Sequence, residues 1–181
     1  MSDFEHIKNQ YIEFWKASGR EKIFKTKGTS MLPLIRESSS IGVEPLAQGE
    51  ELKVGDIALF NRNDCFIAHR IIGKVRNGTA LYYKEKGDHG FSVSTINQDQ
   101  VVGRVVRIYT DAGTINVAGP LWSAINCAAG YYWQFLTEAF ALLSRFKKQL
   151  LGSRTVPLIS NAYSRLYNVL SKLPTLMFRR K

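Results

Sequence analysis

The sequence predicts a mainly β fold, a β-barrel or β-sandwich, preceded by an amphipathic helix and followed by further helices. Short alternating or apolar runs fill the chain from Lys22 to about Val117, and glycine-containing breaks separate them at strand-length spacing. Before this region apolar residues recur every three or four positions, which indicates a helix. After it, 26 consecutive residues carry no charge. We therefore expect an N-terminal helix at 1–20, a β domain at 21–117 and a helical tail at 118–181.

The N-terminal segment is expected to form an amphipathic helix over residues 3–18. Gly19 follows it and suits a left-handed helix cap. Charged residues occur every few positions, so we do not expect a signal peptide or a membrane anchor here. Most such helices pack on a core, and the alternative is a helix that lies on a membrane surface. The apolar positions are Phe4, Ile7, Tyr11, Phe14 and Trp15.

The positive charge of the chain is concentrated in its tail. The chain has 25 Lys and Arg residues against 15 Asp and Glu residues, a net charge of +10. Glu138 is the last acidic residue, so the first 138 residues carry a net +1 and the last 43 carry +9. Basic residues lie between apolar and aromatic ones in this tail, which favours an anionic membrane surface as partner. A solvated basic face on a packed helix is the alternative. No nucleic-acid partner is expected, because basic clusters on exposed loops are absent from the tail.

The uncharged stretch begins at Ala112 and is long enough to span a bilayer. Glycine, asparagine, glutamine and proline residues interrupt its apolar character. We therefore favour an interfacial or core-packed helix from about Leu121 to Lys148. A membrane span or re-entrant segment within 112–143 stays open as the alternative.

The chain has two cysteines, Cys65 and Cys127, with no CxxC pair and no nearby histidine. Two isolated thiols fit a reducing compartment better than a single long-range disulfide, which remains possible. The sequence predicts no metal site and no cofactor.

Few residues are suited to acid–base chemistry near neutral pH, because the chain has only three histidines. His69 lies in the apolar run CFIAHRII, where a lone strand histidine is usually structural. Ser30 lies in GTSMLPLI, where Pro33 holds the preceding residue extended and makes the loop stiff. A serine in a turn is by itself a weak nucleophile signal. With a base and an orienting acid at hydrogen-bond distance it forms the usual activated-serine arrangement.

Five short sequence boxes in order resemble the type I signal peptidase family of serine endopeptidases. They are GTSMLPLI, LKVGDIALF, IAHRII, YYKEKGD and VVGRVVRI, and they lie between Ile23 and Ile108. The resemblance implies a signal-peptidase-like β-barrel or sandwich as the catalytic domain. A histidine in the third box, where bacterial members have a lysine, resembles the endoplasmic-reticulum, archaeal and sporulation-type branch with its Ser–His pair.

The resemblance also implies residue roles. Ser30 matches the nucleophile, His69 the general base, and Asp88 of the Lys-Gly-Asp box an acid near that histidine. The backbone N–H of Ser30 would stabilise the oxyanion, with Thr29 and Met31 as its neighbours at the site. Asp56 in Gly-Asp-Ile is read as a turn-forming residue.

The chain departs from the family pattern in three places. The stretch HGFSVSTIN after Asp88 lacks the second aspartate of His-type members, so the acid role rests on Asp88 alone. Gly28 stands where some relatives have an oxyanion-binding serine. A charged amphipathic helix precedes the Ser-Met box in place of a membrane anchor, which leaves export of the catalytic domain unsupported.

The expected function is a serine endopeptidase that cleaves an extended peptide or preprotein after small residues. We expect it to be membrane-associated, peripherally or through its C-terminal helices. A soluble cytoplasmic processing or self-cleaving peptidase, like the related repressor-type family, is one alternative. A non-catalytic peptide-binding or membrane-surface module on the same scaffold is the other.

Overall fold

The computed structural model describes most of the chain. The described residues are 3–63, 65–90, 92–151, 165–167 and 169–173, with side chains described from residue 10 onward except at 147, 148, 150 and 151. Parts of the expected basic tail therefore lie outside the described residues, including Arg154, Arg179, Arg180 and Lys181. The same holds for the side chains of Phe4 and Ile7 in the N-terminal helix.

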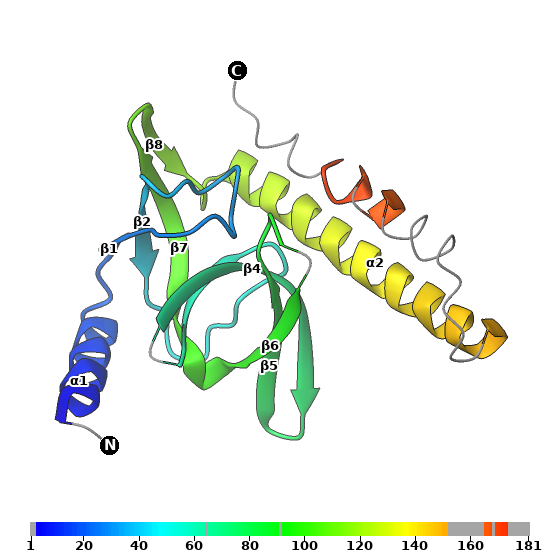
Figure 1. The fold of residues 1–181 in the computed structure, drawn as a ribbon. Coiled ribbons are helices and arrows are strands. Elements are labelled where there is room, and N and C mark those ends of the chain that lie inside the picture. Colours follow the sequence, from blue (N-terminus) through cyan, green and yellow to red (C-terminus); the bar gives the residue numbers. More distant parts are fainter. Residues whose placement is uncertain (1–2, 64, 91, 152–164, 168, 174–181) are drawn as a thin grey trace.

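The main element is a curled, antiparallel sheet of eight strands, so the expectation of a mainly β fold is confirmed (Figure 1). Its neighbouring strands follow the order β1-β2-β7-β3-β4-β5-β6, and β8 pairs with β7. The strands are β1 (Lys22–Lys25), β2 (Ser40–Glu44), β3 (Ile57–Arg62), β4 (Cys65–Asn77), β5 (Ala80–Lys86), β6 (Val93–Asn97), β7 (Val101–Thr110) and β8 (Gly113–Asn116), with a short 3₁₀ turn at Gln98–Gln100.

The curl of the sheet buries both faces of its central strand, β3. Ile57 and Leu59 pack in one apolar cluster, while Ala58 and Phe60 pack in another. Successive side chains of a strand point to opposite faces, so one strand serves both clusters. This explains why IALF reads as a continuous apolar run rather than as an alternating one.

Helix α1 (Asp3–Ser18) forms where the sequence predicts it, and Gly19 follows it with a φ of 62° in the left-handed region. Trp15 anchors its C-terminal end to the sheet. The Trp15 indole is buried, meets the Phe24 ring edge-on at 6.0 Å and donates a hydrogen bond of 2.7 Å to the Arg20 carbonyl. Tyr11 and Phe14 of the same helix remain exposed.

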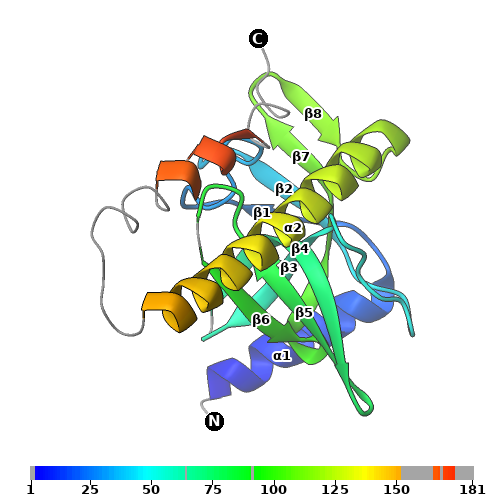
Figure 2. The same ribbon diagram turned by 90° about the vertical axis from the view of Figure 1, so that its right-hand side faces the viewer.

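Helix α2 (Pro120–Leu151) confirms the helix expected between about 121 and 148, and it lies across the sheet (Figure 2). Trp133, Leu136 and Phe140 pack with Ile72 of β4 in a third buried cluster. Gly130 permits the close approach, because a Cβ there would lie 2.6 Å from the Gly55 nitrogen. α2 is therefore part of the same packed core as the strands, although the sequence assigned it to a tail.

The tail continues against α2 in its described part. Tyr167 meets the Phe140 ring edge-on at 4.8 Å, and Tyr132 donates a hydrogen bond of 2.9 Å to the Leu170 carbonyl. In the part of the chain that the structure describes, no helix combines enough length with enough apolar character to cross a bilayer. Cys65 and Cys127 are free thiols.

Candidate active site

Ser30 lies on the turn that follows β1, and its side chain is exposed. Gly28 begins this turn with a φ of 89°, a backbone conformation that disfavours other residues. Met31, which is 3% exposed, anchors the turn in the core. Two backbone hydrogen bonds close it, from Leu32 N to the Thr29 carbonyl at 3.1 Å and from Ile35 N to the Met31 carbonyl at 3.0 Å. The nucleophile candidate is thus exposed on a loop with a buried anchor.

His69 lies on β4 and is held from two sides. The Phe60 ring and the imidazole form a T-shaped contact with 6.0 Å between their centroids. The imidazole Nδ1 lies 2.5 Å from Oε2 of Glu85, and the His69 side chain is 18% exposed. One ring nitrogen is therefore occupied, and the other, Nε2, points toward the Ser30 turn.

Gly87 brings Ser30 and His69 together. A Cβ at Gly87 would lie 3.1 Å from His69 Nε2, 3.1 Å from Ser30 Cβ and 2.7 Å from the Ser30 carbonyl oxygen. Nucleophile and base therefore pack on the same glycine, where no side chain fits. Both residues are described, and no hydrogen bond joins Ser30 Oγ to His69 Nε2. Such bonds are often long or absent in active sites that hold no substrate.

Glu85 of β5 is the acid beside His69. Its carboxylate is 2% exposed and binds His69 through one oxygen and Arg62 through the other, at 2.7 Å. Burial raises the pKa of Glu85, but the hydrogen bond and charge of His69, and then those of Arg62, outweigh burial and lower it overall. The carboxylate is therefore ionised at neutral pH and suited to orient the imidazole and stabilise its protonated form.

Asp88, the acid that the family pattern implies, occupies a different place. Both of its oxygens accept hydrogen bonds from Arg70, from Nε at 2.8 Å and from Nη2 at 2.7 Å, and the pair is buried. The structure therefore pairs Asp88 with Arg70, and the carboxylate that contacts His69 is that of Glu85. The physical reason is strand parity, because Glu85 lies on the His69 face of the β4–β5 hairpin and Asp88 lies beyond the end of β5.

The backbone of Ser30 offers a substrate its N–H group but not its carbonyl oxygen. Its carbonyl accepts a hydrogen bond of 2.9 Å from His89 N. Within the described residues, the Ser30 N–H donates no hydrogen bond, so it is free to bind a developing oxyanion. Thr29 is exposed beside it, and the side chain of Met31 points into the core instead.

A groove of about 410 Å³ runs beside Ser30 and His69. One wall is β1 and its continuation to Gly28, and the other is the beginning of β4, from Phe66 to His69. β1 is the last strand at its end of the sheet, and β4 pairs with β5 only from Arg70 onward. Both walls thus offer strand edges that an extended peptide can join by backbone hydrogen bonds. Apolar side chains form the floor, among them Met31, Ile35, Ile41 and Leu59.

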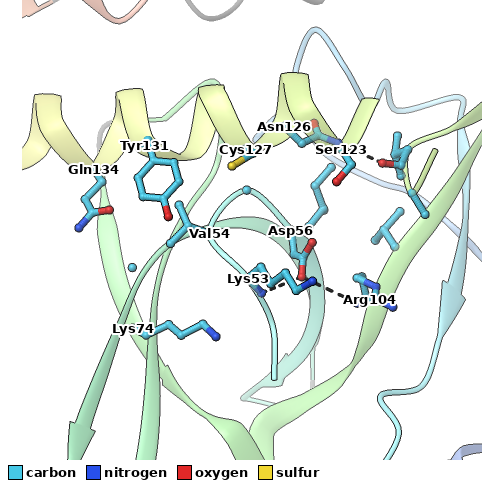
Figure 3. Close-up of a pocket in the computed structure, with 16 residues that line it drawn as sticks. Lys53, Val54, Asp56, Lys74, Arg104, Ser123, Asn126, Cys127, Tyr131 and Gln134 are labelled. Atoms are coloured by element: carbon cyan, nitrogen blue, oxygen red, sulfur yellow. Dashed lines mark hydrogen bonds and ion pairs between the residues drawn. The ribbon is translucent and has the colours of Figure 1, made fainter. Parts of the chain in front are cut away.

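A larger hollow of about 730 Å³ lies between α2 and the turn before β3, and neither Ser30 nor His69 lines it (Figure 3). Asp56 lies in this hollow. Its carboxylate accepts a hydrogen bond of 2.8 Å from Lys53 N, and Asp56 N donates one of 3.0 Å to the Lys53 carbonyl. Burial raises the pKa of Asp56. These bonds agree with the turn-forming role read from the sequence.

The structure adds Glu85, Arg62 and Gly87 to the site, none of which the sequence analysis singled out. Glu85 precedes the Lys-Gly-Asp box by one residue in YYKEKGD. The sequence feature that could have indicated Glu85 is the alternation of side chains along β5, because the buried Tyr83 and Glu85 share one face of this strand. A buried acid becomes a recognisable candidate once its strand is known to pair with the strand that carries the histidine.

Comparison with known proteins adds nothing to this geometry. No protein-family model matches the chain, and no curated protein sequence matches it.

Proposed function

We propose that the protein is a serine endopeptidase similar to type I signal peptidases, with Ser30 as nucleophile and His69 as general base. The observation that carries the proposal is the packing of Ser30 Cβ and His69 Nε2 on Gly87, with Glu85 on the opposite nitrogen of His69. An exposed serine, a half-buried imidazole and a buried carboxylate in this order are the arrangement that activates a hydroxyl.

The proposed reaction proceeds in two steps. Ser30 Oγ attacks the peptide carbonyl carbon while His69 Nε2 accepts the hydroxyl proton. His69 then gives this proton to the leaving nitrogen, the C–N bond breaks, and an acyl ester remains on Ser30. A water molecule hydrolyses the ester with His69 again as base, which restores the serine. Glu85 stabilises the imidazolium in both steps, and the Ser30 N–H stabilises the oxyanion.

The proposed substrate is an extended peptide that joins the edges of β1 and β4 in the groove. Backbone hydrogen bonds to strand edges bind peptides with little dependence on sequence, and side-chain pockets supply selectivity. By resemblance to signal peptidases, small side chains precede the scissile bond.

A peptide library tests the activity. Degenerate decapeptides are incubated with the full-length protein, and cleavage products are sequenced by mass spectrometry. We expect cleavage after small residues, and a loss of at least about 10³-fold in rate for Ser30→Ala and for His69→Ala. Ser38→Ala serves as the matched control, because Ser38 is an exposed serine of the same connection between β1 and β2. Wild-type rates in either site variant, or no cleavage by any preparation, contradict the proposal.

We further propose that the protein binds anionic membrane surfaces peripherally. The outer face of α2 exposes the apolar residues Leu121, Phe135, Leu142 and Phe146, which we call the outer stripe. Phe135 is 70% exposed there, and the chain beyond Glu138 carries +9. Apolar side chains beside basic residues suit the headgroup region of an anionic bilayer.

Vesicle sedimentation tests the membrane proposal. We expect the protein to sediment with phosphatidylserine-containing vesicles, not with phosphatidylcholine vesicles, and to be released by salt. Phe135→Ser should weaken sedimentation, while Phe14→Ser, at an equally exposed aromatic of α1, should not. Equal recovery with both vesicle types, or with none, contradicts this part of the proposal.

A further inference from the structure

The two faces of the β4–β5 hairpin have different partners. Ile71 pairs with Glu85, and Arg70 pairs with Lys86. His69 and Glu85 therefore lie on one face, which carries the candidate active site, while Arg70 and Lys86 lie on the other. Helix α2 covers this second face, as its course across the sheet shows (Figure 2).

Lys86 provides the first link between α2 and the site. Its side chain is fully buried, and Nζ lies 3.5 Å from the centre of the Trp133 ring. The same Nζ donates hydrogen bonds to the carbonyls of Gly87, at 2.8 Å, and of Gly90. Trp133 thus contacts the cation that holds both ends of the loop 87–90.

Arg70 provides the second link. Its Nη1 donates to the side-chain carbonyl of Asn126 on α2 at 2.9 Å and to the Gly55 carbonyl at 3.0 Å. Its other nitrogens hold both oxygens of Asp88. Asn126 therefore fixes the guanidinium that in turn fixes the middle of the loop 87–90.

The loop 87–90 contacts both reacting side chains. Gly87 packs against Ser30 and against His69 Nε2, and His89 N donates to the Ser30 carbonyl at 2.9 Å. A displacement of the loop therefore changes the position of Ser30 relative to His69. Displacements of about 1 Å at a catalytic pair can lower a rate by roughly 10²-fold.

We propose that Trp133 and Asn126 of α2 are positioning residues for the Ser30–His69 pair, acting through Lys86 and Arg70 on the loop 87–90. This inference rests on the proposed peptidase function. It assigns to α2, which lies outside the five sequence boxes, a part in the geometry of the site.

One further observation distinguishes the role of the Trp133 ring from that of its N–H group. Trp133 is fully buried, and its Nε1 has no hydrogen-bond partner among the described residues. The ring contacts Lys86, while the N–H contributes nothing to that contact. The conservative substitution Trp133→Phe keeps an aromatic ring next to Lys86 and should therefore rescue what Trp133→Leu loses.

The test measures two quantities on the full chain, the hydrogen exchange of the His89 amide by NMR and the cleavage of the peptide selected from the library. In Trp133→Leu and Asn126→Ala we expect exchange at least about tenfold faster. We expect kcat to fall at least about tenfold with little change in KM, because the groove is untouched. Trp133→Phe should stay near wild type in both measurements. Leu143→Ala, at an exposed leucine of the same helix, is the matched control.

The two readouts separate this inference from the peptidase proposal. If the wild type cleaves nothing but His89 exchange rises in both variants, the coupling stands and the peptidase function fails. If the wild type cleaves, and folded Trp133→Leu and Asn126→Ala proteins both keep the wild-type kcat and the wild-type exchange of the His89 amide, the inference is overturned. Should Trp133→Leu not fold, unchanged kcat and exchange in Asn126→Ala overturn it alone.

Discussion

Glu85 and Asp88 are two buried carboxylates three residues apart, with different partners. Glu85 binds His69 and Arg62, whereas Asp88 binds Arg70 through both oxygens. Glu85→Gln should therefore lower the cleavage rate by roughly 10²- to 10⁴-fold, because the amide neither fixes the tautomer nor stabilises the imidazolium. The rate is measured on the selected peptide, and the folded fraction is checked by thermal melting.

Asp88→Asn is the comparison for this prediction. It leaves the buried Arg70 guanidinium without a counter-charge, and such a loss costs about 3 kcal/mol or more of unfolding free energy. Asp88→Asn should thus lower stability strongly and, through the loop 87–90, lower the rate less than Glu85→Gln, whose main effect is on the rate. The reverse pattern would assign the orienting role to Asp88 after all.

Gly87 permits the contact between nucleophile and base. Gly87→Ala places a methyl group 2.7 Å from the Ser30 carbonyl oxygen and 3.1 Å from His69 Nε2, so the loop or the Ser30 turn must move. We expect a loss of about 10²-fold in kcat/KM. Gly90→Ala has nothing within 4 Å of the added Cβ and should keep most of the activity. Equal rates for Gly87→Ala and the wild type would show that the contact is unimportant.

Lys86 makes stability depend on pH in a defined window. Burial lowers the pKa of Lys86 to about 8, with the charge of Asp88 opposing the shift, Arg70 adding to it and Glu85 opposing it. Between this value and the ordinary 10.5, the unfolded chain binds more protons at this position than the folded one. The contribution of Lys86 to stability therefore rises with pH in this window.

The measurement compares urea unfolding of the wild type and of Lys86→Met at two pH values. From about pH 7.5 to about pH 9.5 the wild type should gain about 2 kcal/mol relative to the variant. The comparison removes the contributions of other groups that titrate in the same range. A difference that stays constant over this interval would mean that Lys86 titrates as an exposed lysine does.

At the scale of the elements, the sequence predicts the strands better than their pairing. Spacing and glycine breaks locate α1, the β region and the helix from about Leu121. They do not reveal that Ile71 pairs with Glu85, with a register irregularity between Ile71 and Gly73. This register puts Glu85 on the face of His69. It depends on contacts between strands, which a single sequence does not display.

The site residues likewise divide into those that the sequence predicts and those that depend on contacts between elements. Ser30 and His69 follow from the sequence boxes, because both lie in short motifs with fixed neighbours. The links from Asn126 to Arg70 and from Trp133 to Lys86 join residues far apart in the chain. Such links arise from the packing of α2 on the sheet, and no local pattern in the uncharged stretch predicts them.

In the whole molecule, the change from a near-neutral to a basic chain at Glu138 does not coincide with a boundary in the structure. α2 runs through this point and covers Ile72, while Arg70 and Lys86 are fully buried next to it. A chain that ends at residue 117 should therefore fail to fold, because it exposes this apolar surface and removes the contacts of Asn126 and Trp133 with two buried cations. Circular dichroism and thermal melting of that chain test the prediction.

A chain that ends at residue 151 is the control for this truncation, because it keeps all of α2. It should melt cooperatively and keep its cleavage activity, while its affinity for anionic vesicles should fall with the lost basic residues. A 117-residue chain that folds and cleaves like the full protein would show that α2 is an independent appendage.

The central claim, that Ser30 is a nucleophile activated by His69, is tested most directly by trapping the acyl-enzyme. An ester analogue of the selected peptide is mixed with the protein, the reaction is quenched with acid, and the modified residue is located by tandem mass spectrometry. We predict the acyl group on Ser30 of the wild type, and almost none in His69→Ala, where no base accepts the hydroxyl proton. An acyl group on another residue, or turnover of the ester by Ser30→Ala at the wild-type rate, would contradict it.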